Sequence, residues 1–125
     1  MSWDNEKSKE LGRIGEEKVA KYLKNHGYII LKRNWRDRYG EIDIIAENDE
    51  NIVFVEVKTR SEGAIVSGFE AIDAGKIRRT KNMAQMFVNR LNTDLQPRMD
   101  VAEVEVLKNE HGEEIWKLNY VKSAY

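Results

Sequence analysis

From Gly40 to Thr59 the chain reads GEIDIIAENDENIVFVEVKT, and this stretch carries the clearest structural signal in the sequence. The segments 41–47 and 52–59 are rich in β-branched residues and alternate in the way that half-buried strands do. The polar segment 48–51 between them has the composition of a turn. We therefore predict that the two segments form a β-hairpin.

A symmetric four-residue loop also sets the register of this hairpin, because it pairs residue 47 with residue 52 and continues outward in step. Asp43 then lies opposite Glu56, and Glu41 lies opposite Lys58. Side chains two positions apart in a strand share a face, so these four charges are predicted to cluster at one end of the sheet. The opposite face is wholly apolar and is expected to hold Ile42, Ile44, Ala46, Val53, Val55 and Val57.

Two carboxylates that face each other across strands repel unless a cation lies between them. Carboxylate oxygens and water suit Mg²⁺ or Mn²⁺, so Asp43 and Glu56 are candidate metal ligands and catalytic residues. A metal at this place would lower the pKa of an attacking water, and the Lys58 ammonium would orient that water or stabilise a pentavalent phosphate. The alternative is that Lys58 only neutralises Glu41 and Glu56 as a cross-strand ion pair.

Two helices and three further strands are predicted around the hairpin. Apolar residues at three-to-four spacing indicate a helix over 8–26, which ends at His26-Gly27, and a second helix carries the stripe from Ile77 to Leu91. The further strands are expected at 28–34, 99–107 and 115–121, with a loop over 35–40, a Ser/Gly-containing loop before the second helix, and Pro97 in a turn. The order α-β-β-β-α-β-β predicts an α/β (α+β) fold with a mixed central β-sheet flanked by helices, in a single domain over 1–125.

Composition restricts the kind of metal and the compartment. The 125 residues include no cysteine and two histidines, which excludes disulfide scaffolds and thiolate zinc sites and leaves oxygen-bound cations. The N-terminus lacks the apolar stretch of a signal peptide, and no apolar run exceeds four residues. We expect a soluble cytoplasmic protein with no membrane partner.

The net charge of −1 is a sum over unequal segments. Residues 1–40 carry +4, residues 41–57 carry −6, residues 58–98 carry +4 and residues 99–125 carry −3. Basic segments around an acidic one are expected where carboxylates bind a cation and nearby bases hold a polyanion. The predicted nucleic-acid-binding residues are Arg60, Lys76, Arg78, Arg79 and Lys81, with a solvated helical face as the alternative.

Four sequence motifs also resemble a known family. Asp43 followed after twelve residues by Glu56-Val57-Lys58 is similar to the PD-(D/E)xK signature of restriction-endonuclease-like nucleases, including archaeal Holliday-junction resolvases. The signature's Pro is replaced by Ile42. More closely, the chain resembles the YraN-type family of predicted endonuclease-like proteins in four ordered motifs, which are GRIGE at 12–16, GEIDIIA at 40–46, VFVEVKTR at 53–60 and RMDV at 98–101.

The resemblance implies a restriction-endonuclease-like fold and a metal-dependent nuclease site. It adds Glu16 of the first helix as a third metal ligand, and Gly12 and Gly15 would let that helix approach the sheet closely. The alternative for Glu16 is an exposed side chain that complements the helix dipole. A homodimer is expected because many junction-cutting relatives of the fold are dimers.

The sequence therefore predicts a metal-dependent nuclease that hydrolyses phosphodiester bonds in DNA or RNA, with structured or branched nucleic acid as the expected substrate. The alternative is a non-catalytic nucleic-acid-binding module with the same fold. Carboxylate-based glycoside hydrolysis is disfavoured, because the chain is small for a sugar cleft and Lys58 and the flanking bases suit phosphate better.

Overall fold

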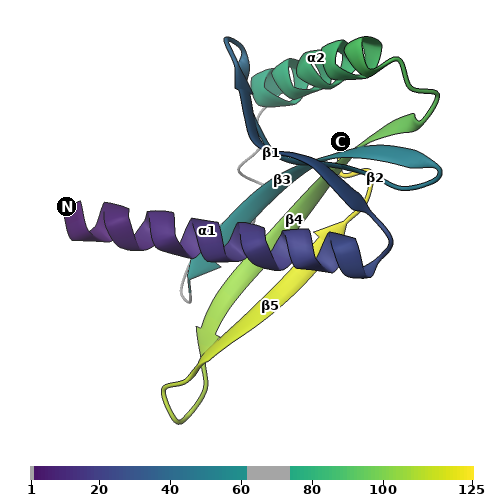
Figure 1. The fold of residues 1–125 in the computed structure, drawn as a ribbon. Coiled ribbons are helices and arrows are strands. Elements are labelled where there is room, and N and C mark those ends of the chain that lie inside the picture. Colours follow the sequence, from purple (N-terminus) through teal and green to yellow (C-terminus); the bar gives the residue numbers. More distant parts are fainter. Residues whose placement is uncertain (1, 62–73) are drawn as a thin grey trace.

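The computed structural model describes residues 2–61 and 74–125 (Figure 1). The side chains of residues 2–5 are not described. Two helices and five strands follow in the order α1 (Ser2–Asn25), β1 (Ile29–Asp37), β2 (Gly40–Glu47), β3 (Asn51–Ser61), α2 (Ala74–Leu91), β4 (Gln96–Lys108) and β5 (Glu114–Val121). The predicted α+β class and element order are confirmed.

The strands form one mixed sheet in the spatial order β1-β2-β3-β4-β5. The pair β3–β4 is parallel, and the other three neighbouring pairs are antiparallel. Because α2 connects the two parallel strands, it supplies the crossover that parallel pairing requires. The β4–β5 hairpin projects beyond the rest of the sheet in Figure 1.

The helices pack on opposite faces of the sheet. Val19 and Leu23 of α1 lie in one buried cluster with Val53 and Val55 of β3. The intervening Phe54 points the other way and lies in a second cluster, whose members on α2 include Met83 and Ala84. The alternation along β3 therefore gives the sheet two apolar faces, each covered by one helix.

The first helix ends where the sequence predicts. Gly27 has a φ of +87°, and the Tyr28 N–H donates to the Leu23 carbonyl at 3.0 Å. A left-handed residue that closes such a bond is the usual glycine stop of a helix. At its other end α1 begins at Ser2, earlier than the predicted residue 8.

The predicted loop over 35–40 is wrong. The strand β1 continues to Asp37, and only Arg38 and Tyr39 connect it to β2. The Asp37 carboxylate closes this turn by accepting the Tyr39 N–H at 2.7 Å. The Trp35 ring also lies edge-to-face on Phe87 of α2, with centroids 5.4 Å apart, so packing against the helix stabilises the extended strand.

Two smaller boundaries also differ from the sequence prediction. Pro97, predicted in a turn, is the second residue of β4 and lies opposite Ile52. Proline is tolerated at the start of a strand, where a missing N–H costs little. The predicted Ser/Gly-containing loop falls on 62–73, outside the described residues.

The prediction that Ile42 shares a face with Ile44 is also wrong. Ile42 lies in the α2-side cluster, whereas Ile44 lies in the α1-side cluster. The paired strand behaves in the same way, because Arg33 contacts α1 while Trp35 contacts α2. Asn34, between them, has a φ of +50°. Both strands therefore rotate at the level of Asn34 and Asp43, and this rotation places the candidate site.

Candidate functional site

Asp43 lies where β2 separates from β3. The predicted hairpin register is confirmed from Glu47–Ile52 to Ile44–Val55, which is the last pair of the ladder. At the next residue of β2, Asp43, a side-chain contact replaces the backbone pairing. The Asp43 Oδ2 accepts the backbone N–H of Val57 at 2.8 Å. The side chain of Asp43 is thus fixed against β3 and beside Glu56.

The Asp43 carboxyl group has a pKa raised to about 7. Burial is the largest cause, and the negative charge of Glu56 is the second. Glu16 and Glu41 add smaller contributions in the same direction, and the Val57 N–H opposes them. The neutral form of this carboxyl is therefore favoured to a higher pH than usual, and a cation bound between Asp43 and Glu56 would favour the ionised form.

Glu56 is buried, with 8% of the residue exposed, and it is held by two lysines. The Lys58 Nζ lies 3.0 Å from Glu56 Oε1, and Lys76 of α2 forms an ion pair with the same oxygen. Burial alone would lower the pKa of Lys76, but the hydrogen bond and charge of Glu56 outweigh it and raise the pKa. Sequence reasoning assigned Lys76 to phosphate binding, whereas the structure places it in the carboxylate cluster.

Glu41 has a different partner from the one that the register indicates. The sequence placed it opposite Lys58, but its Oε1 lies 3.3 Å from Arg36 Nε on β1. The two residues are directly opposite in the β1–β2 register. Glu41 is therefore neutralised on the side of β1, and the ion pair of Lys58 is with Glu56.

Glu16 reaches the cluster from α1. Burial raises its pKa above the usual value, although a hydrogen bond with Asn34 opposes the rise. The next cause that raises it is the charge of Glu41. Glu16 is therefore a partly buried carboxyl group beside the cluster, and it differs from Glu17, which is exposed and bound to Arg33 at 2.5 Å.

A close contact between α1 and β3 sets the position of Glu16. A Cβ atom added to Gly15 would lie 2.1 Å from the Oγ1 of Thr59, a distance that no side chain tolerates. The Thr59 Oγ1 is itself buried without a hydrogen-bond partner in the described structure. Glycine at 15 is therefore required for the helix to lie this close to the strand. Gly12 has no such role, because nothing lies within 4 Å of a Cβ placed there.

The donor set suits a hard cation. In the described ranges no three His, Asp or Glu side chains form a ready-made metal-binding group. Mg²⁺ and Mn²⁺ are commonly held by one or two carboxylates, with water and substrate phosphate as the other ligands. Asp43 and Glu56 offer two carboxylates that repel each other, so the residues fit such an ion.

The remaining predicted basic residues lie on two elements, α2 and β3. Arg78, Arg79 and Lys81 are exposed on α2, on either side of the buried Thr80. Arg60 is half-buried near the end of β3. The structure therefore separates Lys76, which is bound at the carboxylates, from the three exposed α2 cations.

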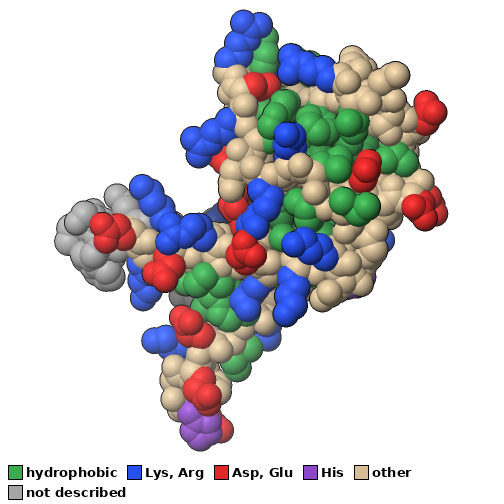
Figure 2. Space-filling model, in the orientation of Figure 1, with side chains coloured by type: hydrophobic (Ala, Val, Ile, Leu, Met, Phe, Trp, Pro, Cys, Tyr) green, Lys and Arg blue, Asp and Glu red, His purple; other side chains and the backbone are tan. Residues whose placement is uncertain are grey.

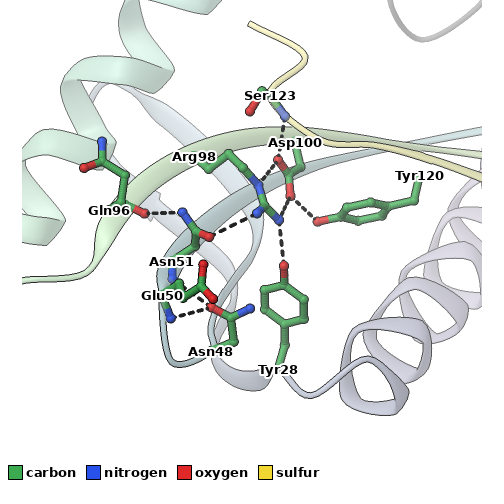
Figure 3. A network of polar contacts seen from close by, with 9 residues as sticks. All are labelled: Tyr28, Asn48, Glu50, Asn51, Gln96, Arg98, Asp100, Tyr120 and Ser123. Carbon is green, nitrogen blue, oxygen red and sulfur yellow. Dashed lines mark hydrogen bonds and ion pairs between the residues drawn. The ribbon is translucent and has the colours of Figure 1, made fainter.

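A second polar network was not assigned a role from the sequence (Figure 3). Asp100 is fully buried and accepts two bonds from Arg98, each at 2.9 Å, one from the Tyr120 hydroxyl at 2.5 Å and one from the Ser123 N–H at 3.0 Å. Arg98 also donates to the Tyr28 hydroxyl at 2.7 Å. The Arg98-Met99-Asp100 motif marks this network in the sequence. Its partners Tyr28 and Tyr120 are distant in sequence, so the motif alone does not predict them.

Fold and site together define an α+β protein with a carboxylate and lysine cluster where two strands of a mixed sheet separate. The chain belongs to the family described as Uncharacterised protein family UPF0102, which matches residues 15–104 and is the YraN-type family. It is similar to the UPF0102 protein of Alkaliphilus oremlandii, with 42% identity over 94% of this chain and 99% of the relative. It is also similar to that of Caldicellulosiruptor saccharolyticus, with 44% identity over 94% of this chain and 98% of the relative.

A further relative is the UPF0102 protein of Parabacteroides distasonis, with 38% identity over 93% of this chain and 92% of the relative.

Neither α1 nor α2, the two helices among the described residues, is long and apolar enough to cross a membrane.

Proposed function

We propose that this protein is a metal-dependent nuclease that hydrolyses phosphodiester bonds in DNA or RNA, including structured or branched nucleic acids. The observation that carries the proposal is Asp43, a carboxylate held by the Val57 N–H against a second buried carboxylate, Glu56, with the Lys58 ammonium 3.0 Å from that partner. Perturbed acids beside a lysine are typical of functional sites.

In this proposal Asp43 and Glu56 hold Mg²⁺ or Mn²⁺, and Glu16 assists from α1. The ion would supply a Lewis acid that lowers the pKa of a bound water. Both lysines contact Glu56 Oε1, which leaves Oε2 as the proposed ligand atom. Hydrolysis forms a P–O bond from water and breaks the bond to the leaving sugar oxygen, which gains a proton. Lys58 orients the water or stabilises the charge of the pentavalent phosphate.

The exposed bases of α2 are proposed to hold the nucleic acid. Arg78, Arg79 and Lys81 are exposed on the same helix as Lys76, so phosphates can reach them. Lys76, which pairs with Glu56, lies at the carboxylates and is proposed to contact the phosphate nearest the cut bond, with Arg60 of β3 as a further proposed phosphate contact. A homodimer that presents two such sites to a branched substrate is part of the same proposal.

A non-catalytic nucleic-acid-binding module is the second candidate. The observation that favours it is the pair of lysines on Glu56, because Lys58 and Lys76 neutralise this carboxylate without any metal. In that case the cluster would be a structural ion-pair network, and the exposed α2 bases alone would carry the function.

The deciding experiment is cleavage of single-stranded, duplex, flap and four-way-junction substrates, in DNA and RNA form, with Mg²⁺, Mn²⁺ or EDTA. We expect metal-dependent cleavage of at least one substrate. Asp43→Asn should abolish it, whereas Asp49→Asn, which makes the same change in the exposed turn of the same hairpin, should not. Inactivity of the wild-type protein on every substrate with each metal would favour the binding module.

Metal binding can be measured without activity. An ion that binds only the folded protein stabilises it by RT ln(1 + [L]/Kd), about 2.7 kcal/mol at a hundredfold excess over Kd. We expect millimolar Mg²⁺ or Mn²⁺ to raise the melting temperature of the wild type and of Asp49→Asn, but much less that of Asp43→Asn. An unchanged wild-type melting temperature would contradict a metal site at Asp43 and Glu56.

A further inference from the structure

A groove between α1 and β1 lies beside the candidate site. Its volume is about 550 Å³. Its lining includes two carboxyl groups, the amide of Asn34 and four exposed cations, which are Glu16, Glu17, Asn34, Arg13, Lys18, Lys21 and Arg33. Figure 2 shows Lys and Arg side chains following α1, with acidic side chains between them. None of the four cations belongs to the basic residues assigned from the sequence.

The charge of this groove is positive in balance. Of its four cations, Arg33 is bound to Glu17 at 2.5 Å, and the Lys18 ammonium lies 5.1 Å from the centroid of the Trp116 ring. Within the part of the chain that the structure describes, Arg13 and Lys21 have no carboxylate partner. These two cations therefore line the groove without an ion pair, while Glu17 is paired with Arg33.

The groove leads to Asp43. Asn34, which lines it, lies between the β1–β2 pairs Arg33–Ile44 and Trp35–Ile42, and is therefore opposite Asp43. Its left-handed conformation accompanies the rotation of the two strands, and its side chain hydrogen-bonds with Glu16. Glu16 in turn lines the groove and contributes to the electrostatics of Asp43. One wall of the groove is thus shared with the carboxylate cluster.

The spacing of the cations indicates a polymer. Arg13 and Lys21 are eight residues apart on one helix, which is about 12 Å along its axis at 1.5 Å per residue. A single site for a mononucleotide would gather its cations at one point. At the 3.4 Å axial spacing of phosphates along one strand of a duplex, a row of this length covers three to four spacings and thus about four successive phosphates.

We propose that the groove between α1 and β1 binds the phosphate backbone of a nucleic-acid strand and leads that strand to Asp43 and Glu56. This inference rests on the proposed nuclease function for the direction of the strand. Arg13 and Lys21 contact phosphates, and Arg33 exchanges Glu17 for a phosphate when the strand enters. The strand thus contacts the protein on the α1 side of the cluster as well as at the α2 bases.

The test is binding of a fluorescein-labelled 12-nucleotide oligothymidylate, measured by anisotropy in EDTA at several salt concentrations. The variant Arg13→Glu/Lys21→Glu reverses the two groove cations. The matched control Lys9→Glu/Lys24→Glu makes the same change in net charge on exposed positions of the same helix that do not line the groove. Both variants should melt near the wild-type temperature, and the milder Arg13→Gln/Lys21→Gln serves if the reversed protein does not fold.

We expect the groove reversal to weaken binding at least tenfold and to reduce the salt slope by about 1.4, since each lost phosphate contact on a single strand removes about 0.7. The control should weaken binding less than threefold. Equal losses in both variants would show a response to net charge alone and would overturn the groove, as would unchanged binding of the groove variant.

The two proposals can fail separately. If the wild type binds the oligonucleotide through the groove but cleaves nothing with any metal, the nuclease function fails and the groove stands. If the wild type cleaves and the groove variant binds and cleaves equally well, the groove fails and the function stands. Absence of binding by the wild type would overturn the groove, whereas the nuclease function is decided by the cleavage of the substrate panel.

Discussion

Asp43 and Asp100 are two aspartates in one sheet with opposite surroundings. Asp100 accepts four hydrogen bonds and forms a two-bond ion pair with Arg98. Asp43 accepts the Val57 N–H and faces the negative charges of Glu56, Glu16 and Glu41, which together with burial raise its pKa to about 7. Removing one partner of a fully paired buried charge is strongly destabilising, whereas a buried charge among like charges stores electrostatic free energy that a ligand can release.

The same comparison separates the lysine and arginine partners. Arg98 presents a planar fork to Asp100 and also donates to Tyr28, so its geometry is fixed from several sides. Lys58 and Lys76 reach Glu56 as point charges on flexible stems, from a strand and from a helix. The Arg98–Asp100 pair therefore has a fixed geometry. We expect the contacts of Lys58 and Lys76 with Glu56 to rearrange when a substrate binds. Substitutions in the two regions test this difference.

Asp100→Asn should cause the largest loss of stability. The substitution leaves the Arg98 guanidinium, whose side chain is 14% exposed, without its carboxylate. Removing one partner of a buried ion pair lowers the free energy of unfolding by about 3–5 kcal/mol. Urea denaturation measures this loss. Asp49→Asn on the exposed turn is the control, with an expected change within about 0.5 kcal/mol. A variant as stable as the wild type would show that the Arg98–Asp100 ion pair does not stabilise the fold.

Lys58→Ala should act on catalysis more than on stability. If Lys58 stabilises the transition state, its removal lowers turnover by about a hundredfold or more at saturating substrate while affinity changes little. The measurement is the cleavage rate per folded molecule beside a denaturation curve, with Lys117→Ala on the exposed face of β5 as control. Full activity in a destabilised Lys58→Ala protein would assign Lys58 to the ion pair alone.

Gly15→Ala tests whether the close approach of α1 determines the position of Glu16. The added methyl group meets the Thr59 Oγ1, so we expect a loss of about 1–3 kcal/mol in the free energy of unfolding. Thr59→Ala in the same chain should restore part of it, which a double-mutant cycle measures. Gly12→Ala, on the same helix but in open space, should instead stabilise the protein by up to about 1 kcal/mol. Equal effects at both glycines would contradict the close contact.

Asp43→Asn should stabilise the metal-free protein at alkaline pH. Because the folded pKa of about 7 lies above the usual 3.8, Asp43 contributes stability that is complete below pH 3.8 and is lost as the pH rises to about 7. Asparagine can still accept the Val57 N–H and carries no charge. In EDTA the variant should match the wild type near pH 4 and exceed it by about 1 kcal/mol or more at pH 8.5. A difference that does not grow with pH would contradict the raised pKa.

Arg78→Glu/Arg79→Glu should produce the smallest effect, confined to binding. Both side chains are exposed, so the melting temperature should hardly change. Affinity for a DNA duplex should fall by about threefold to tenfold, and the salt slope by about 1.8, since each lost phosphate contact on a duplex removes about 0.9. Binding with an unchanged slope would place the nucleic-acid surface elsewhere.

The hairpin shows how much of the site local sequence could predict. Alternation along 41–47 and 52–59 and the four-residue turn were enough to predict the Glu47–Ile52 to Ile44–Val55 ladder, because strand alternation and turn closure involve near neighbours. The same rule failed at Ile42, one step beyond Asp43. There β2 leaves β3 and follows the rotated β1, and the packing of Trp35 on Phe87 of α2 is a contact between residues 52 positions apart.

Local sequence was thus enough to predict the element order, the α+β class, the hairpin register as far as Ile44–Val55 and the helix stop at Gly27, since each depends on residues a few positions apart. Three other features depend on the tertiary structure. Lys76 binds Glu56, and Glu16 and the cations of α1 line a groove next to Asp43. Arg98 and Asp100 bind two tyrosines that are distant in sequence. The physical reason is that a side chain's charge has no fixed role until packing brings its partners and excludes water from them. The strand rotation at Asn34 and the docking of two helices on opposite faces set those distances, and residues far apart in the sequence specify both.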